Sequence, residues 1–141
     1  MYTLGEKTKT KVTRELSWSL NMGFPAASDV IKGQMVKLES DGEVEKLSAV
    51  TDVALGMVTK GGLAGERVTV QTKFQAELVG LADGAITLGQ EVSVSSYDDV
   101  LKADNYKTSV ATNSVVGIAL SGAADNEEVT VGILIQPYIK G

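Results

Sequence analysis

The feature that most limits the fold of this chain is a series of short segments in which apolar and polar residues alternate, each ended by a turn signal. Such segments occupy residues 35–39, 43–47, 54–59, 66–72, 75–79, 91–95, 115–120 and 128–135. Period-two alternation is typical of strands with one buried face, and Asp41-Gly42 between two runs is a strong hairpin signal. No window of helical length has a 3.6-residue period. We therefore expect an all-β fold, either a small β-barrel or a sandwich.

The alternating segments also occur in two similar sets. Residues 33–38 resemble 89–94, residues 55–58 resemble 116–119, and residues 65–70 resemble 126–131, in the same order. Two such β-units would each expose an apolar face alone and bury it against the other. We predict one β domain over 33–141 with an internal pseudo-repeat at 33–73 and 89–135. The alternative is that β proteins in general reuse Gly-x-x-Val patterns, although two copies are too few for a solenoid.

Residues 1–32 differ in charge from the rest of the chain. They carry five basic and three acidic residues, a net charge of +2, whereas the whole chain has −5, so residues 33–141 hold −7. Residues 7–20 alternate like a strand, and residues 21–28 have loop character. We predict an extended N-terminal arm over 1–32 that becomes ordered against a partner or a neighbouring subunit; an ordinary mobile terminus is the alternative. The predicted contact residues are Lys7, Lys9, Lys11, Arg14, Leu16 and Trp18.

The composition leaves little catalytic chemistry. The 141 residues include no cysteine and no histidine, which excludes thiolate and imidazole ligands and the Ser-His-Asp triad. Asp98-Asp99 is best interpreted as a solvated hairpin tip, since adjacent strand residues point to opposite faces. We expect no enzyme activity, no metal and no cofactor. A carboxylate enzyme ranks third, behind the two non-enzymatic functions given below. Its acids would be drawn from Asp52, Asp83, Asp98 and Asp104.

Two classes of partner are also disfavoured. The acidic net charge, and an arm with only four cations and no aromatic residue interleaved before Trp18, argue against direct nucleic-acid binding. No apolar run approaches the length of a membrane span, so we expect no membrane partner.

Several of these segments resemble a known family. Residues 54–58 (Ala-Leu-Gly-Met-Val), 64–70 (Ala-Gly-Glu-Arg-Val-Thr-Val) and Phe74 are similar to the first half of the tailed-bacteriophage capsid cement, or head decoration, protein family. Residues 88–94, 115–120 and 129–134 are similar to its second half, so the resemblance covers about residues 30–135. Where the family usually has Tyr-Trp-Asp, this chain has Ser-Ser-Tyr-Asp at 95–98, and the N-terminal arm is not part of the family's pattern.

The resemblance implies a non-enzymatic structural protein of the virion. Such proteins decorate the exterior of an icosahedral capsid, bridge major capsid subunits and are often homotrimers; they are made in the host cytoplasm. The alternative function is a β-sandwich module that recognises carbohydrate or another surface ligand, or a component of a virion fibre. That alternative would require exposed aromatic platforms, for which the chain offers only Tyr2, Trp18, Tyr97, Tyr106 and Tyr138.

Overall fold

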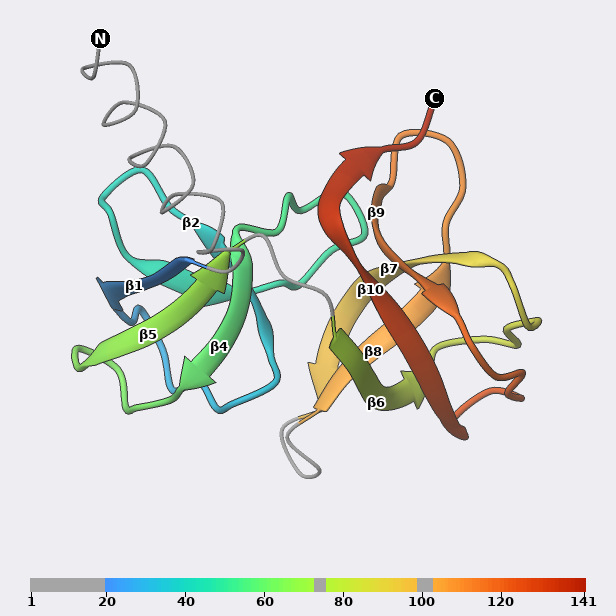
Figure 1. Cartoon of the computed structure of the whole chain (residues 1–141), viewed down its shortest axis with the longest axis horizontal. Helices are drawn as coiled ribbons and strands as arrows, with labels where there is room; N and C mark the ends of the chain where they lie inside the picture. The colour runs from blue at the N-terminus through green and yellow to red at the C-terminus, as the bar shows by residue number, and fades with distance from the viewer. Residues whose placement is uncertain (1–19, 73–75, 99–102) are drawn as a thin grey trace, which may run out of the picture.

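The computed structural model describes residues 20–72, 76–98 and 103–141, which form ten β-strands and no helix (Figure 1). The predicted all-β fold is therefore confirmed. The strands are β1 (Leu20–Pro25), β2 (Met35–Leu38), β3 (Val44–Lys46), β4 (Gly56–Lys60), β5 (Arg67–Thr72), β6 (Ala76–Ala82), β7 (Glu91–Asp98), β8 (Ala103–Thr108), β9 (Ser114–Ala119) and β10 (Glu128–Ile139).

The strands form two units that lie side by side in Figure 1. The first unit is a five-stranded sheet in the order β1-β5-β4-β2-β3, and a single parallel bridge between Ala26 and Val44 joins its two outer strands. The second unit is a closed barrel in the order β10-β6-β8-β7-β9. The parallel pair β6–β8 closes it, with Leu81 opposite Asn105 and Ala82 opposite Tyr106.

The two units share one hydrogen-bond framework. Strands β1 to β5 correspond in order to β6 to β10, and glycines with positive φ, Gly33 (97°) and Gly89 (88°), occupy the same turn in both. Only glycine adopts this backbone conformation without steric cost. The equivalent backbone N–H···O bonds, in the first and second unit respectively, are Ala26 to Glu66 and Ala82 to Glu127, Val30 to Gly62 and Ile86 to Ala123, and Gly33 to Val58 and Gly89 to Ala119.

Two parts of the chain differ from the sequence-based expectation. Residues 21–28 were expected as a loop within the arm, but β1 pairs with β5 along its whole length, from Leu20 opposite Thr72 to Pro25 opposite Arg67. The first unit therefore includes residues 20–25, which lie before the predicted domain boundary at residue 33. The remainder of the predicted arm lies outside the described residues. Strand β8 was also not expected, because its sequence, Ala-Asp-Asn-Tyr-Lys-Thr, contains residues that are depleted in strands.

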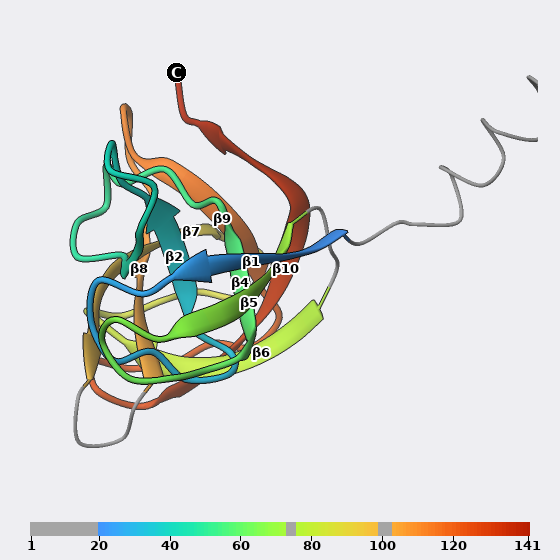
Figure 2. The ribbon, with the colours of Figure 1, turned by 90° about the vertical axis from the view of Figure 1, so that its left-hand side faces the viewer.

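The buried apolar residues form two clusters. One lies within the first unit and consists mainly of valines. The other fills the barrel and also includes Met35, Leu47, Ala54 and Met57 from the first unit. In Figure 2, where the first unit faces the viewer, the barrel strands lie behind it. Because one cluster contains side chains from both units, the two units pack as one body.

Candidate functional site

The contact residues predicted from the sequence, Lys7, Lys9, Lys11, Arg14, Leu16 and Trp18, lie outside the described residues. The described part of the chain offers three other features that could serve a function. They are a surface depression on the first unit, a polar contact between the two units, and an exposed apolar face on the barrel.

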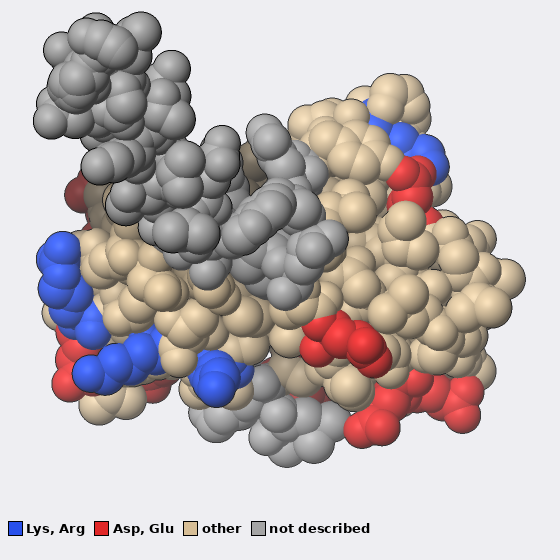
Figure 3. Space-filling model, viewed as in Figure 1, with Lys and Arg blue, Asp and Glu red and all other residues tan. Residues whose placement is uncertain are grey.

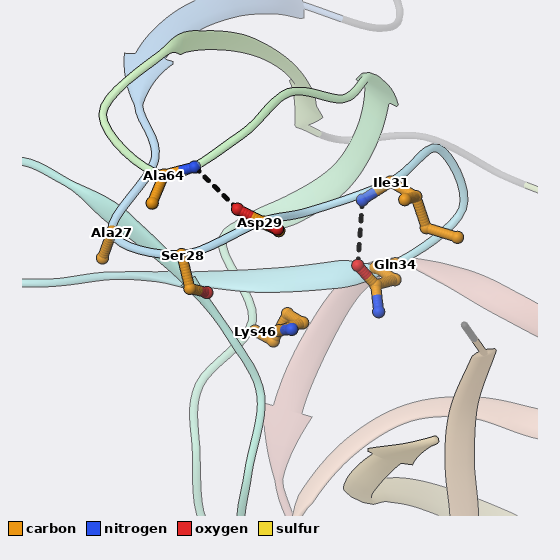
Figure 4. Close-up of a pocket in the computed structure, with 7 residues that line it drawn as sticks. All are labelled: Ala27, Ser28, Asp29, Ile31, Gln34, Lys46 and Ala64. Atoms are coloured by element: carbon orange, nitrogen blue, oxygen red, sulfur yellow. Dashed lines mark hydrogen bonds between the residues drawn. The ribbon is translucent and has the colours of Figure 1, made fainter. Parts of the chain in front are cut away.

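The depression, about 410 Å³ in volume, lies beside the loop that follows β1 (Figure 4). The side-chain Oε1 of Gln34 accepts the N–H of Ile31 at 2.9 Å, and Asp29 Oδ1 accepts the N–H of Ala64 at 2.9 Å. In the barrel, Gln90 Oε1 accepts the N–H of Thr87 at 2.7 Å in the equivalent place. The glutamine that lines the depression therefore belongs to a loop-closing motif that both units use, and its role is structural.

The polar contact between the units centres on Asp104 of β8. This side chain is only 4% exposed, and its Oδ2 accepts the backbone N–H of Met35 from the first unit at 2.9 Å. Its other oxygen, Oδ1, is buried without a hydrogen-bond partner. Burial raises the pKa of Asp104 to about 7, although the hydrogen bond from Met35 and the charge of Lys46 act in the opposite direction. Lys46 also lies over the ring of Tyr97, 4.1 Å from its centroid.

The other acids proposed for carboxylate chemistry serve local structure. Asp52 Oδ2 accepts the N–H groups of Ser48 and Ala49 and pairs with Lys37 Nζ at 3.2 Å. Burial opposes ionisation of Asp52, but these hydrogen bonds and the lysine outweigh it and lower the pKa of the carboxyl group. Asp98 and Asp104 lie on neighbouring strands. Tyr97 stands opposite Asp104, so Asp98, one residue further, points to the other face of the ribbon.

The fourth of these acids, Asp83, lies in the loop after β6, where its backbone N–H donates to the carbonyl of Tyr106. Within the described ranges, no group of three or more acidic, histidine or cysteine residues could hold a metal ion.

The aromatic residues of the described structure do not form one exposed platform. Tyr106 is buried in the barrel core, Tyr97 is covered by Lys46, and Tyr138 is exposed on β10. Tyr2 and Trp18, which the carbohydrate hypothesis also needs, lie outside the described residues.

An apolar face lies on the outside of the barrel. Its exposed side chains are Val79 on β6, Ile118 on β9, and Leu120 just beyond β9, and we call these three residues the outer barrel face. Strand β10 runs between them, with Thr130 opposite Val79 and Gly132 opposite Ile118. Over β10 and β9, Figure 3 shows mainly uncharged surface with acidic side chains below it.

The part of the chain that is described has no helix of the length and apolarity that a membrane crossing requires.

Sequence reasoning did not identify this face. Alternation shows that Val129 and Val131 of β10 share a side opposite to Thr130, but it does not show which neighbouring side chains stay exposed once the barrel closes. No signal in the sequence distinguishes Ile118 on the outside from Val116 in the core.

This chain is similar to known proteins at the level of a family and of a fold. The model of a family described as phage cement protein matches residues 17–135. No curated protein sequence matches the chain. Among solved structures, the base of the head fibre gp8.5 of bacteriophage phi29 is similar in fold, with a TM-score of 0.58 and 17% sequence identity. The alignment covers 85% of this chain and 98% of the phi29 chain. The family match spans most of the two units and their shared core, and on this ground the chain belongs to the phage cement protein family.

Proposed function

We propose that this phage cement protein binds the exterior of an assembled icosahedral capsid, bridges neighbouring major capsid subunits and thereby stabilises the capsid, without enzymatic activity. Family membership makes it a phage capsid-associated structural protein, and the match over residues 17–135 is the observation that carries the proposal. A ligand that binds only the assembled lattice stabilises that lattice by mass action. On this proposal the protein is made in the host cytoplasm and resides in the virion.

The described structure suits a passive scaffold. Its polar side chains are used to close loops and to join the two units, as Gln34, Asp52 and Asp104 do. The cluster of buried residues shared by both units makes the domain rigid, and rigidity lowers the entropy lost when a clamp orders on its partner.

We further propose that residues 1–19 and the β domain have different tasks. The segment before β1 has a positive net charge, whereas the chain as a whole is acidic. Opposite charges on the two parts would orient the molecule as it approaches a charged surface. The contact residues on this proposal are Lys7, Lys9, Lys11, Arg14, Leu16 and Trp18, which approach the capsid or an adjacent subunit.

Cosedimentation with undecorated capsids tests the main proposal. Purified protein mixed with such capsids should pellet with them and reach saturation, and the bound fraction should fall as the salt concentration rises. A variant that lacks residues 2–19 keeps β1 and should bind at least about tenfold more weakly, because it loses the charged contacts. Lys60→Gln, which removes a charge from β4, is the control. Absence of the protein from the pellet at every salt concentration contradicts the proposal, and unchanged affinity of the truncated chain contradicts the role of the arm.

A second candidate function is supported by one comparison. The phi29 protein of similar fold is the base of a head fibre, so this chain could serve as the base or recognition part of a fibre. A glycan array distinguishes the two functions, since a recognition module should retain specific saccharides and a cement protein should retain none.

A further inference from the structure

We infer that copies of this chain associate head to tail, with the outer barrel face of one copy packed against the first unit of the next. The contact would repeat the one that already joins the two units within a chain. The inference rests on the proposed function and deepens it, because it names the surfaces by which copies of the chain would form the homotrimer that the family resemblance implies. Three copies then close a ring of six β-units.

Equivalent positions on the packing side of the two units differ in their exposure. In the first unit, Gln71 stands opposite Met57, which stands opposite Met35 on β2. Both methionines are buried, in the cluster shared with the barrel. These three residues form a row across β5, β4 and β2. The equivalent row in the barrel, across β10, β9 and β7, is Gly132, Ile118 and Glu91. Here Ile118 is 36% exposed. In the first unit, this row packs against the barrel. In the described structure, the equivalent row of the barrel has no second β-unit packed against it.

Equivalent positions on the receiving side, where the barrel meets the first unit, also differ in their exposure. Val94 and Ser114 of the barrel are buried, and the N–H of Ser114 donates to the carbonyl of Val50 in the first unit at 2.7 Å. By strand register the equivalent of Val94 is Leu38, and the offset between the similar segments 55–58 and 116–119 makes Val53 the equivalent of Ser114. These two side chains are 50% and 61% exposed. Ser114, which contacts the first unit, thus corresponds to an exposed position at the other end of the chain, and so does Val94, which lies in the apolar cluster that the two units share.

The two uncovered surfaces are complementary in the way that a repeating interface requires. The barrel carries an exposed packing row around Ile118, and the first unit carries exposed receiving positions at Leu38 and Val53. A contact between these two types of surface already joins the two units within the chain. In Figure 1, the arrowhead of β9 lies on the side of the barrel away from the first unit, so it is accessible to a second copy. Contacts between two different surfaces are heterologous, and they close into rings when the rotation per copy allows it.

The exposed apolar side chains of the outer barrel face would be stabilised by packing against another protein surface instead of water. The row at Ile118 continues into Leu120 and Val79, and Leu120 lies across the place that a side chain at Gly132 would occupy. Contiguous exposed apolar residues of this kind are typical of interfaces between protein chains. The chain already provides a fitting partner for this surface, so we assign a second copy as its occupant.

Crosslinking at single cysteines tests the assignment, because the chain has no cysteine of its own. Ile118→Cys and Val53→Cys are prepared as separate proteins, mixed, and treated with a short bifunctional maleimide. The mixture should give a covalent species of twice the 14.8 kDa chain mass, in which each chain carries a different cysteine. A mixture of Ile118→Cys with Leu63→Cys is the matched control, since Leu63 is as exposed as Val53 but lies in another loop. Equal crosslinking in both mixtures, or none in the first, would overturn the inference.

The mass in solution provides an independent reading. The wild-type protein should have about three times the mass of one chain. Ile118→Asp and Val53→Asp should each give monomers, whereas Leu63→Asp should not. Circular dichroism establishes that each variant is folded; if Ile118→Asp is not, the milder Ile118→Thr is used and should raise the concentration for half-dissociation at least about tenfold. A wild-type monomer at every concentration, or trimers in both aspartate variants, refutes the assignment. No capsid is present in these measurements, so their failure is distinguishable from a failure of capsid binding.

Discussion

Replacing Asp104 with asparagine should remove a large pH dependence from the stability of this protein. The carboxyl group lies between the two units, where burial raises its pKa to about 7 from an ordinary value of 3.8. The folded protein therefore holds the proton more tightly than the unfolded chain does. Stability from this group is fully present below about pH 3.8 and is lost as the pH rises through about 7.

The size of the effect follows from the difference between the two pKa values. Each pKa unit corresponds to about 1.4 kcal/mol, so the folded state loses about 4 kcal/mol relative to the unfolded state between pH 4 and pH 8. Asparagine retains an oxygen that can accept the N–H of Met35, and it carries no charge at any pH. The free energy of unfolding of Asp104→Asn, relative to that of the wild type, should therefore rise by about 4 kcal/mol across this range.

The charged and titratable groups around Asp104 allow a second test. Lys46 of β3 lowers the pKa of Asp104, so Lys46→Gln should raise it further and move the loss of stability to higher pH. Tyr106, on the same strand, is buried, and its pKa is raised well above 10 by burial and by the charge of Asp104. It therefore stays protonated throughout the measurement.

Urea unfolding followed by circular dichroism, at intervals from pH 4 to pH 8, measures these differences. Asp52→Asn is the control, and its difference from the wild type should stay constant between pH 4 and pH 8. The pKa of Asp52 is lowered in the folded protein, so its contribution is present at neutral pH and is lost as the pH falls below about 4. A constant difference between wild type and Asp104→Asn over the whole pH range, with unchanged urea dependence, would refute the reasoning.

Two further predictions concern glycines. Gly33→Ala and Gly89→Ala should each lower stability by about 1–2 kcal/mol, because both residues have positive φ and no atom lies within 4 Å of an added Cβ, so backbone strain is the only cost. The two losses, read from urea midpoints, should be similar, and a change at only one site would argue against equivalent turns. Gly80→Ala should cost about 3 kcal/mol, since an added Cβ would meet the ring of Tyr106 and a backbone carbonyl in the barrel; an unchanged thermal midpoint would show that the barrel relaxes.

The parts of the fold that could be predicted are those determined by neighbours in the sequence. The hairpin of β2 and β3 follows from alternation on either side of Asp41-Gly42, and Gly42 has the positive φ that such a turn needs. The similarity between the two sets of segments depends on glycines at equivalent turns, which are also local features. These signals are the basis for the prediction of two similar β-units.

The parts that could not be predicted depend on contacts far along the chain. Strand β1 contains Gly23 and Pro25 and resembles a loop, but it is held by pairing with β5, more than 40 residues away. Strand β8 is rich in polar residues, and it is a strand because Tyr106 fills the barrel core and Asp104 joins the first unit. The outer barrel face is missed for the same reason, since exposure of Ile118 is decided by which unit lies next to it.

The interface within the chain and the proposed interface between copies differ in the charged groups that they contain. Within the chain, Lys46 stands opposite Val36, and it contributes its charge near Asp104. The equivalent pair in the barrel is Thr108 and Val92, so the barrel has a hydroxyl group at the position where the first unit has an ammonium group. A contact between copies would therefore lack the lysine and would depend more on apolar burial. Because the titrating carboxyl group lies inside the chain, pH should change the stability of each copy far more than the association between copies.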